Sequence, residues 1–217
     1  MLKAQIATVT PFQQNCSVIW CSDTMEGAVV DPGGDVDKIM DTVNRNGVTL
    51  TKILLTHGHL DHAGGAADLK EQYDLPIIGP HKDDAFWLEG IEEHAANYGI
   101  PGLRCCTPDE WLDDGAEVSV GKVTLKAIHC PGHTPGHLVF YDADSQVAFV
   151  GDVLFQGSIG RTDFPKGNHQ DLLDSITEKL WPLGNDVTFV PGHGGLSTFG
   201  RERESNPFVA DKILNSG

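Results

Sequence analysis

The chain has 217 residues, of which 40% are hydrophobic and 21% are charged, the composition of an ordinary globular protein. Asp and Glu outnumber Lys and Arg by 31 to 15, so the net charge of −16 disfavours nucleic acid and anionic membrane surfaces as partners. With no long apolar run, no visible signal peptide, and five cysteines without a CxxC motif, the sequence predicts a soluble protein of a reducing compartment, the cytoplasm.

Short strands and helices alternate along the chain. The spacing of Val36, Ile39, Met40 and Val43, for example, predicts a helix over residues 35–44. No repeat or linker is visible, so we expect a single domain over residues 1–217. In chain order we expect strands at 2–9, 15–21 and 27–31, the helix 35–44, a strand at 52–56, helices at 63–73 and 83–98, a loop at 101–115, strands near 117–120, 122–129, 137–142 and 146–151, a helix at 168–180, a strand at 187–190, and a short helix or turn from residue 198.

The most informative motif directly follows the predicted strand 52–56. It reads Thr56-His57-Gly58-His59-Leu60-Asp61-His62 and holds four possible metal ligands within six residues. Neutral imidazoles and carboxylates are good ligands for zinc, iron or manganese. A solvated polar loop is the alternative, but such a density of ligands after a buried strand favours a metal site.

Three later strand ends carry a further candidate ligand beside a glycine. Glycine allows the close backbone approach that a crowded site requires. Together with the first motif they supply five histidines and two aspartates, enough for two ions that share one carboxylate. These later candidates are His133, Asp152 and His193.

This order of motifs resembles the metallo-β-lactamase superfamily over nearly the whole chain. The resemblance implies an α/β fold, an αββα four-layer sandwich with the metals at one edge. It implies that His57, His59 and His133 hold one ion, that Asp61, His62 and His193 hold the other, and that Asp152 bridges them. Asp31, in the turn Asp31-Pro32-Gly33-Gly34, would hydrogen-bond a ligand loop. His137, which the family does not use as a ligand, would support the site from outside.

Within the superfamily the chain is most similar to the glyoxalase-II-like hydrolases, in particular to the short bacterial members of YcbL type. The segments Cys130–His137, Gly151–Phe155 and Gly200–Pro207 carry this similarity. The chain ends 24 residues after His193, so we expect it to lack the C-terminal helical domain that supplies much of the glutathione site in full-length glyoxalase II. Arg161 matches the family's basic position and is the candidate for substrate contact. His129 is expected to be packed, and His81, His94 and His169 to lie on the surface.

The resemblance implies a binuclear metallohydrolase with two divalent ions, zinc being favoured over iron or manganese. A metal-bridging hydroxide, with Asp61 beside it, would hydrolyse a small glutathione-derived thioester such as S-lactoylglutathione to D-lactate and glutathione, a step of methylglyoxal detoxification. The alternative enzyme is a persulfide dioxygenase with a single iron at His57, His133 and Asp152. A lactonase or β-lactam hydrolase, and a non-catalytic metal-binding scaffold, are less favoured.

Overall fold

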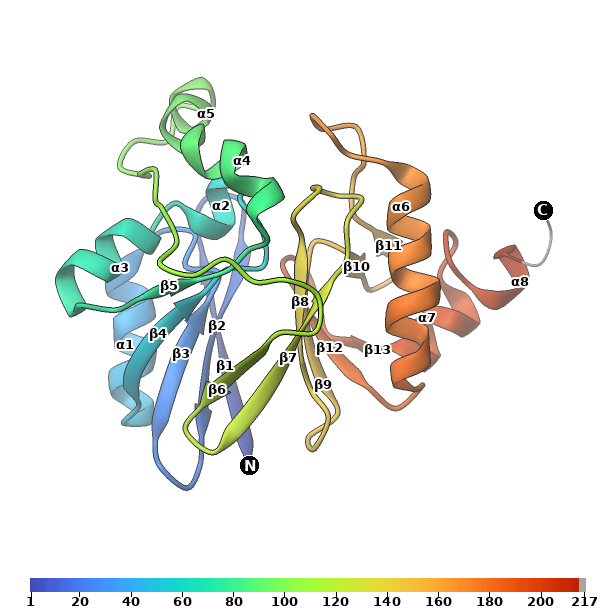
Figure 1. Ribbon diagram of the computed structural model, residues 1–217, viewed down its shortest axis with the longest axis horizontal. Coiled ribbons are helices and arrows are strands. Elements are labelled where there is room, and N and C mark those ends of the chain that lie inside the picture. The colour runs from blue at the N-terminus through green and yellow to red at the C-terminus, as the bar shows by residue number, and fades with distance from the viewer. Residues whose placement is uncertain (215–217) are drawn as a thin grey trace.

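Two β-sheets form the centre of the molecule, and helices cover the outer face of each (Figure 1). The structure is a computed structural model that describes residues 1–214. The first sheet has the strand order β1-β2-β3-β4-β5, with β1–β3 antiparallel and β3–β5 parallel. Its strands are β1 (Leu2–Val9), β2 (Gln14–Cys21), β3 (Glu26–Val30), β4 (Thr49–Leu54) and β5 (Ile77–Ile78).

The second sheet has the order β13-β12-β9-β8-β7-β6, in which β9 and β12 are parallel and the other neighbours antiparallel. A two-stranded hairpin, β10 (Leu154–Phe155) with β11 (Ser158–Ile159), follows β9. The strands of the second sheet are β6 (Glu117–Val120), β7 (Val123–His129), β8 (Leu138–Asp142), β9 (Val147–Gly151), β12 (Thr188–Pro191) and β13 (Ser197–Thr198).

The helices divide between the two outer faces. In Figure 1, α1 and α3 lie outside the first sheet, and α6 and α7 lie outside the second. No helix within residues 1–214 is long and apolar enough to cross a membrane. The helices are α1 (Val36–Asn46), α2 (Leu60–Ala63), α3 (Ala66–Tyr73), the 3₁₀ turn η1 (Lys82–Asp84), α4 (Ala85–Glu89), α5 (Ile91–Asn97), α6 (His169–Asp174) with its π-helical continuation η2 (Ser175–Leu180), the 3₁₀ turn η3 (Trp181–Leu183), α7 (Phe199–Ser205) and α8 (Asp211–Leu214).

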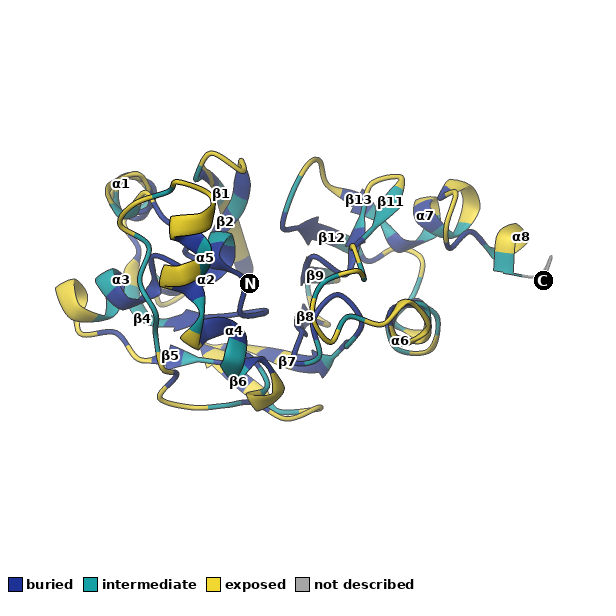
Figure 2. Cartoon of the chain, turned by 90° about the horizontal axis from the view of Figure 1, so that it is seen from above, coloured by how far each residue is buried: buried dark blue, intermediate teal, exposed yellow. Residues whose placement is uncertain are grey.

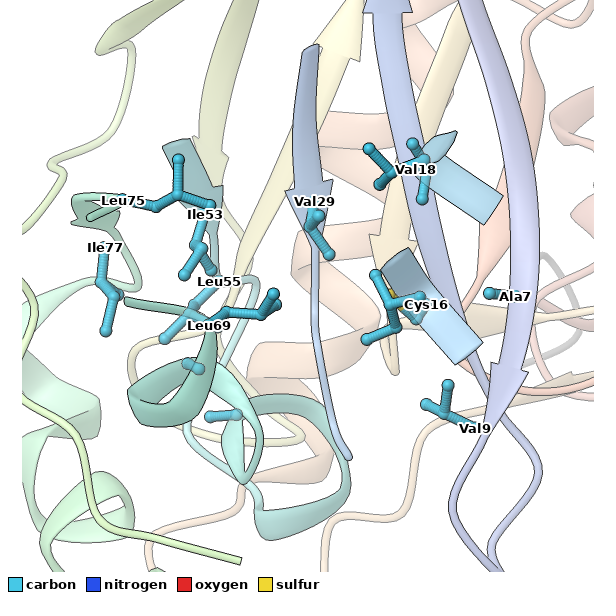
Figure 3. Close-up of a cluster of buried hydrophobic side chains, with 14 of the residues drawn as sticks. Ala7, Val9, Cys16, Val18, Val29, Ile53, Leu55, Leu69, Leu75 and Ile77 are labelled. Atoms are coloured by element: carbon cyan, nitrogen blue, oxygen red, sulfur yellow. The ribbon is translucent and has the colours of Figure 1, made fainter. Parts of the chain in front are cut away.

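Alternation along the strands builds a core in three layers. Val18 and Val29 face the α1 side, where they join the cluster drawn in Figure 3, whereas Ile19 and Ala28 face the second sheet. Successive side chains of a strand point to opposite faces, so each central strand serves two layers. A third cluster packs the second sheet against α6, η2 and α7. Figure 2 shows the buried residues gathered in the strands and the exposed ones along the outer helices. The predicted αββα sandwich is confirmed.

Two predicted helices are wrong as continuous elements. The helix expected at 63–73 is divided at Gly64 and Gly65, where Gly65 N–H donates to Pro32 O instead of continuing the helix. The helix expected at 83–98 is divided into η1, α4 and α5, with a break at Gly90. The other predicted strands and helices are present, with bounds that differ by at most three residues from those expected.

Candidate metal centre

Loops that follow four strands bring the seven candidate ligands together at one edge of the two sheets. His57 and His59 lie in the loop after β4, Asp61 and His62 lie in the short helix α2 that follows it, and the loop after β7 carries His133. Asp152 directly follows β9, and His193 lies two residues beyond β12. The site is therefore built from both sheets.

The first group consists of His57, His59 and His133, all of them buried. His59 Nδ1 lies 3.1 Å from His57 Nε2 and 3.0 Å from His133 Nε2. Three ring nitrogens thus converge on one point, as the binding of one metal ion by three imidazoles requires.

The second group consists of Asp61, His62 and His193. Asp61 Oδ2 lies 3.1 Å from His193 Nε2 and 3.8 Å from His62 Nε2. Asp152 lies between the two groups, with Oδ1 3.4 Å from His62 Nε2 and Oδ2 3.5 Å from His133 Nε2. One carboxylate therefore faces both groups.

Hydrogen bonds on the far side of the rings fix the orientation of three of these histidines. His133 Nδ1–H donates to Arg161 O at 2.7 Å, and His193 Nδ1–H donates to Phe12 O at 3.2 Å. His62 Nδ1 lies 2.9 Å from Asp31 Oδ2. In each case the outer partner leaves Nε2 free to face the site, the arrangement that accompanies histidine ligands in metal proteins.

The buried carboxylate of Asp31 makes several hydrogen bonds to the first ligand loop. It accepts from Thr56 N–H at 2.7 Å and from the Thr56 hydroxyl at 2.6 Å, besides its contact with His62. Because the hydroxyl proton is directed to Asp31, Thr56 Oγ1 is left to accept from His57 Nδ1 at 3.0 Å. His57 and His62 are thus oriented through one buried carboxylate.

His137 also lies beside the site without facing either group. Its Nε2 accepts from Asp152 N–H at 3.1 Å, and its ring stacks on His57 with centroids 4.5 Å apart. It therefore fixes the backbone of the residue that faces both groups.

The electrostatics of the site suit the binding of cations. Burial lowers the pKa of His57, His59 and His133, so these rings are neutral at pH 7, the form that binds metal. Burial also acts on His62, but the carboxylates of Asp152 and Asp61 outweigh it and raise its pKa well above the ordinary value. His62 is then positively charged beside these two carboxylates. A metal ion bound there would supply that positive charge in its place.

Two buried polar atoms support the fit to metal ions. His62 Nε2 and Asp152 Oδ1 lie 3.4 Å apart as an ion pair, but neither makes a hydrogen bond within residues 1–214. A buried polar atom that makes no hydrogen bond costs about 1–3 kcal/mol, and a bound cation would offset this cost at both atoms. The donor set of imidazoles and carboxylates suits zinc, iron and manganese alike.

Asp84 was not singled out from the sequence, yet it joins two of the ligand loops. Its fully buried carboxylate accepts from Gly58 N–H at 2.9 Å, from the Thr134 hydroxyl at 2.8 Å and from Gly136 N–H at 2.6 Å. Burial raises the pKa of Asp84 to about 6. The only hint in the sequence is an acidic residue at the start of a helix, which is common on surfaces.

A cavity of about 950 Å³ opens above the two groups. His59, Asp61, His133, Asp152 and His193 reach it from below. In Figure 1, α4 and α5 and the segment between β11 and α6 rise on opposite sides of this edge. The walls are rich in aromatic rings, namely Phe12, Trp87, Tyr98, Phe155 and Phe164.

Arg161 lines this cavity, but its guanidinium is already engaged. It donates to both carboxylate oxygens of Asp163, at 2.9 and 2.8 Å, and lies 4.4 Å from the centroid of the Phe164 ring. Within residues 1–214 it is the only arginine or lysine that lines the cavity. His94, expected on the surface, also lines the cavity and lies 5.2 Å from the Trp87 ring, so that expectation was wrong.

Residues 9–193 match the family model of the metallo-beta-lactamase superfamily. The chain belongs to this superfamily. A protein of Haemophilus influenzae named hydroxyacylglutathione hydrolase GloC is 42% identical over 212 residues, 97% of this chain and 100% of that protein. The crystal structure of BLEG-1 B3 metallo-beta-lactamase has a TM-score of 0.87 at 35% identity and covers 96% of this chain and 99% of its own. TTHA1623 in a di-iron-bound form has a TM-score of 0.86 at 34% identity, with 94% and 99% covered. The chain is a metal-dependent hydrolase of this superfamily.

Proposed function

We propose that this protein hydrolyses glutathione thioesters of the S-lactoylglutathione type and releases the hydroxy acid and glutathione. The observation that carries the proposal is the pair of convergent ligand groups, faced by one shared carboxylate, beneath an open cavity. The full-length similarity to GloC supports the substrate class. Because ligands from both sheets are needed, we also propose that residues 1–217 act as one catalytic domain.

In this proposal His57, His59 and His133 hold one divalent ion, Asp61, His62 and His193 hold a second, and Asp152 serves both. Zinc is the proposed metal. When bound, such ions supply an acidified water and a Lewis acid for the acyl oxygen.

The remaining roles belong to side chains of the chain itself. Burial opposes the ionisation of Asp61, but His62 and His193 hold its pKa below the ordinary value, so Asp61 is a carboxylate at pH 7 and can orient the attacking water by accepting a hydrogen bond from it. The aromatic walls hold the substrate and limit the access of bulk water to the reacting bond. Water adds to the acyl carbon, the carbon–sulfur bond breaks, and the products are a carboxylic acid and a thiol. A thiolate leaves readily, so no strong general acid is required.

The test is thiol release from S-lactoylglutathione by untagged, zinc-loaded protein, monitored with a thiol reagent. We expect turnover that depends on metal and is lost after treatment with a chelator. Oxygen uptake with glutathione persulfide, measured on iron-loaded protein in parallel, would identify a dioxygenase instead. Turnover in that assay alone would overturn the proposal.

Opening of a β-lactam ring is a second candidate, favoured by the structural similarity to BLEG-1 along the whole chain. Both reactions require water to attack a carbonyl carbon above the same ligand groups. A kcat/KM for hydrolysis of a chromogenic cephalosporin that exceeds the kcat/KM for S-lactoylglutathione would favour this candidate.

A further inference from the structure

A second cluster of side chains that could hold a metal ion lies outside the cavity. His81, Asp83 and His129 each place one ligand atom within 4.8 Å of the others. None of the three lines the cavity described above. His81 precedes η1, and His129 is the last residue of β7, so the cluster joins two segments that are distant in the sequence.

His129 has the outer hydrogen bond typical of a histidine ligand. Its Nε2–H donates to Pro135 O at 2.7 Å, which fixes the tautomer and leaves the lone pair of Nδ1 available. Its ring stacks on that of His81 with centroids 4.4 Å apart and 23° between the ring planes, so one ring must turn before both can direct a lone pair at the same ion. Burial lowers the pKa of His129, so the ring is neutral at pH 7.

Two carboxylates lie beside His81. Asp83 Oδ2 lies 3.3 Å from His81 Nδ1, which also accepts from Asp83 N–H at 3.3 Å, and Asp113 Oδ1 lies 3.4 Å from His81 Nε2. The side chains of Asp83 and Asp113 are 52% and 91% exposed, so an ion can enter from solution. Two imidazoles and a carboxylate, with room for water as a further ligand, form a donor set that zinc accepts.

We propose that His81, Asp83 and His129 form a further binding site for a divalent transition-metal ion, separate from the seven-residue centre. An ion here would link the start of η1 to the end of β7. The same two segments lead to the ligand loops: Asp84 ends η1 and holds Gly58, Thr134 and Gly136, and β7 runs into the loop that carries His133. The expected effect is a more stable support for the ligand loops. This inference does not depend on the proposed function.

The test is equilibrium dialysis of untagged protein against rising concentrations of free Zn²⁺, with bound metal per chain measured by mass spectrometry. We expect wild type to bind one ion more than His129→Gln, whose amide can still donate to Pro135 O. Losing an outer hydrogen bond to a ligand already weakens metal binding about 10–100-fold, so losing the ligand itself should weaken it by at least about 10-fold. Asp83→Asn, a change at an exposed side chain that should not disturb folding, is expected to weaken the same ion.

His169→Gln is the matched control, because His169 is exposed at the start of α6 and outside the cluster. It should bind as many ions as wild type. Zinc should also raise the melting temperature of wild type and His169→Gln further than that of His129→Gln. Equal zinc binding, in number and affinity, by wild type, His129→Gln and Asp83→Asn would overturn the proposal.

Discussion

Replacing Gly33 by alanine should damage the metal centre although Gly33 is not a ligand. A Cβ atom at this position would lie 1.6 Å from the backbone oxygen of Asp61. Real Cβ contacts are essentially never shorter than 3.0 Å, so the two atoms must separate by about 1.4 Å or more. Overpacking of this kind typically costs about 1–3 kcal/mol. For a chain of this size each kcal/mol lowers the melting temperature by roughly 2–4 °C.

The displacement should also weaken metal binding, because Asp61 belongs to the second ligand group. We expect zinc affinity at that group to fall by about 10-fold or more, while the group of His57, His59 and His133 keeps its ion. Metal content at fixed free zinc and the melting temperature measure the two effects. Gly34→Ala is the matched control, since its Cβ would meet only the side-chain ends of Thr10 and Leu103, at 3.2 and 3.3 Å. If Gly33→Ala and Gly34→Ala behave alike, the argument from close packing is refuted.

Three other substitutions test individual residues. Arg161→Ala should lower kcat/KM for S-lactoylglutathione by about 5–30-fold at unchanged metal content, and unchanged kinetics would remove Arg161 from the substrate site. Since the pKa of Asp84 is raised to about 6, the folded state keeps a proton between about pH 4 and pH 6 that the unfolded chain has released. Asp84 alone should therefore lower the free energy of unfolding of metal-free protein by about 3 kcal/mol as the pH rises through this range, and this loss should appear as the difference between urea titrations of wild type and Asp84→Asn. His137→Ala should weaken zinc binding about 10–100-fold, because Asp152 N–H loses its acceptor; wild-type affinity would contradict that role.

The strands were predictable because alternation is visible in a single sequence. Along β2, Val18 and Ile19 already indicate two buried faces, and the structure divides them between two core layers. Strands of two residues, such as β5, β10, β11 and β13, are too short to show alternation and were missed. The helix break at Gly64 and Gly65 depends on contact with Pro32, which is distant in the sequence.

The candidate ligands can be located in the sequence because each lies in a local motif after a strand. The residues that orient them were harder to find. Asp84 accepts hydrogen bonds from Gly58 and Gly136, which are 26 and 52 residues away in the sequence. The residues next to Asp84 in the sequence do not indicate these partners. Arg161 orients His133 through its backbone oxygen, which has no side-chain signature at all. Asp31 was found only because a family resemblance drew attention to its turn.

The central claim is that one carboxylate serves two metal ions, and counting metal in Asp152→Ala tests it most directly. Asp152 directs Oδ1 toward His62 and Oδ2 toward His133, one from each ligand group. Untagged wild type and variant would be equilibrated at the same free zinc concentration, low enough to leave weaker surface sites empty, and their bound metal measured. We expect up to two ions per chain in wild type and a loss at both groups in Asp152→Ala. A variant that keeps the wild-type number of ions would contradict the shared role of Asp152.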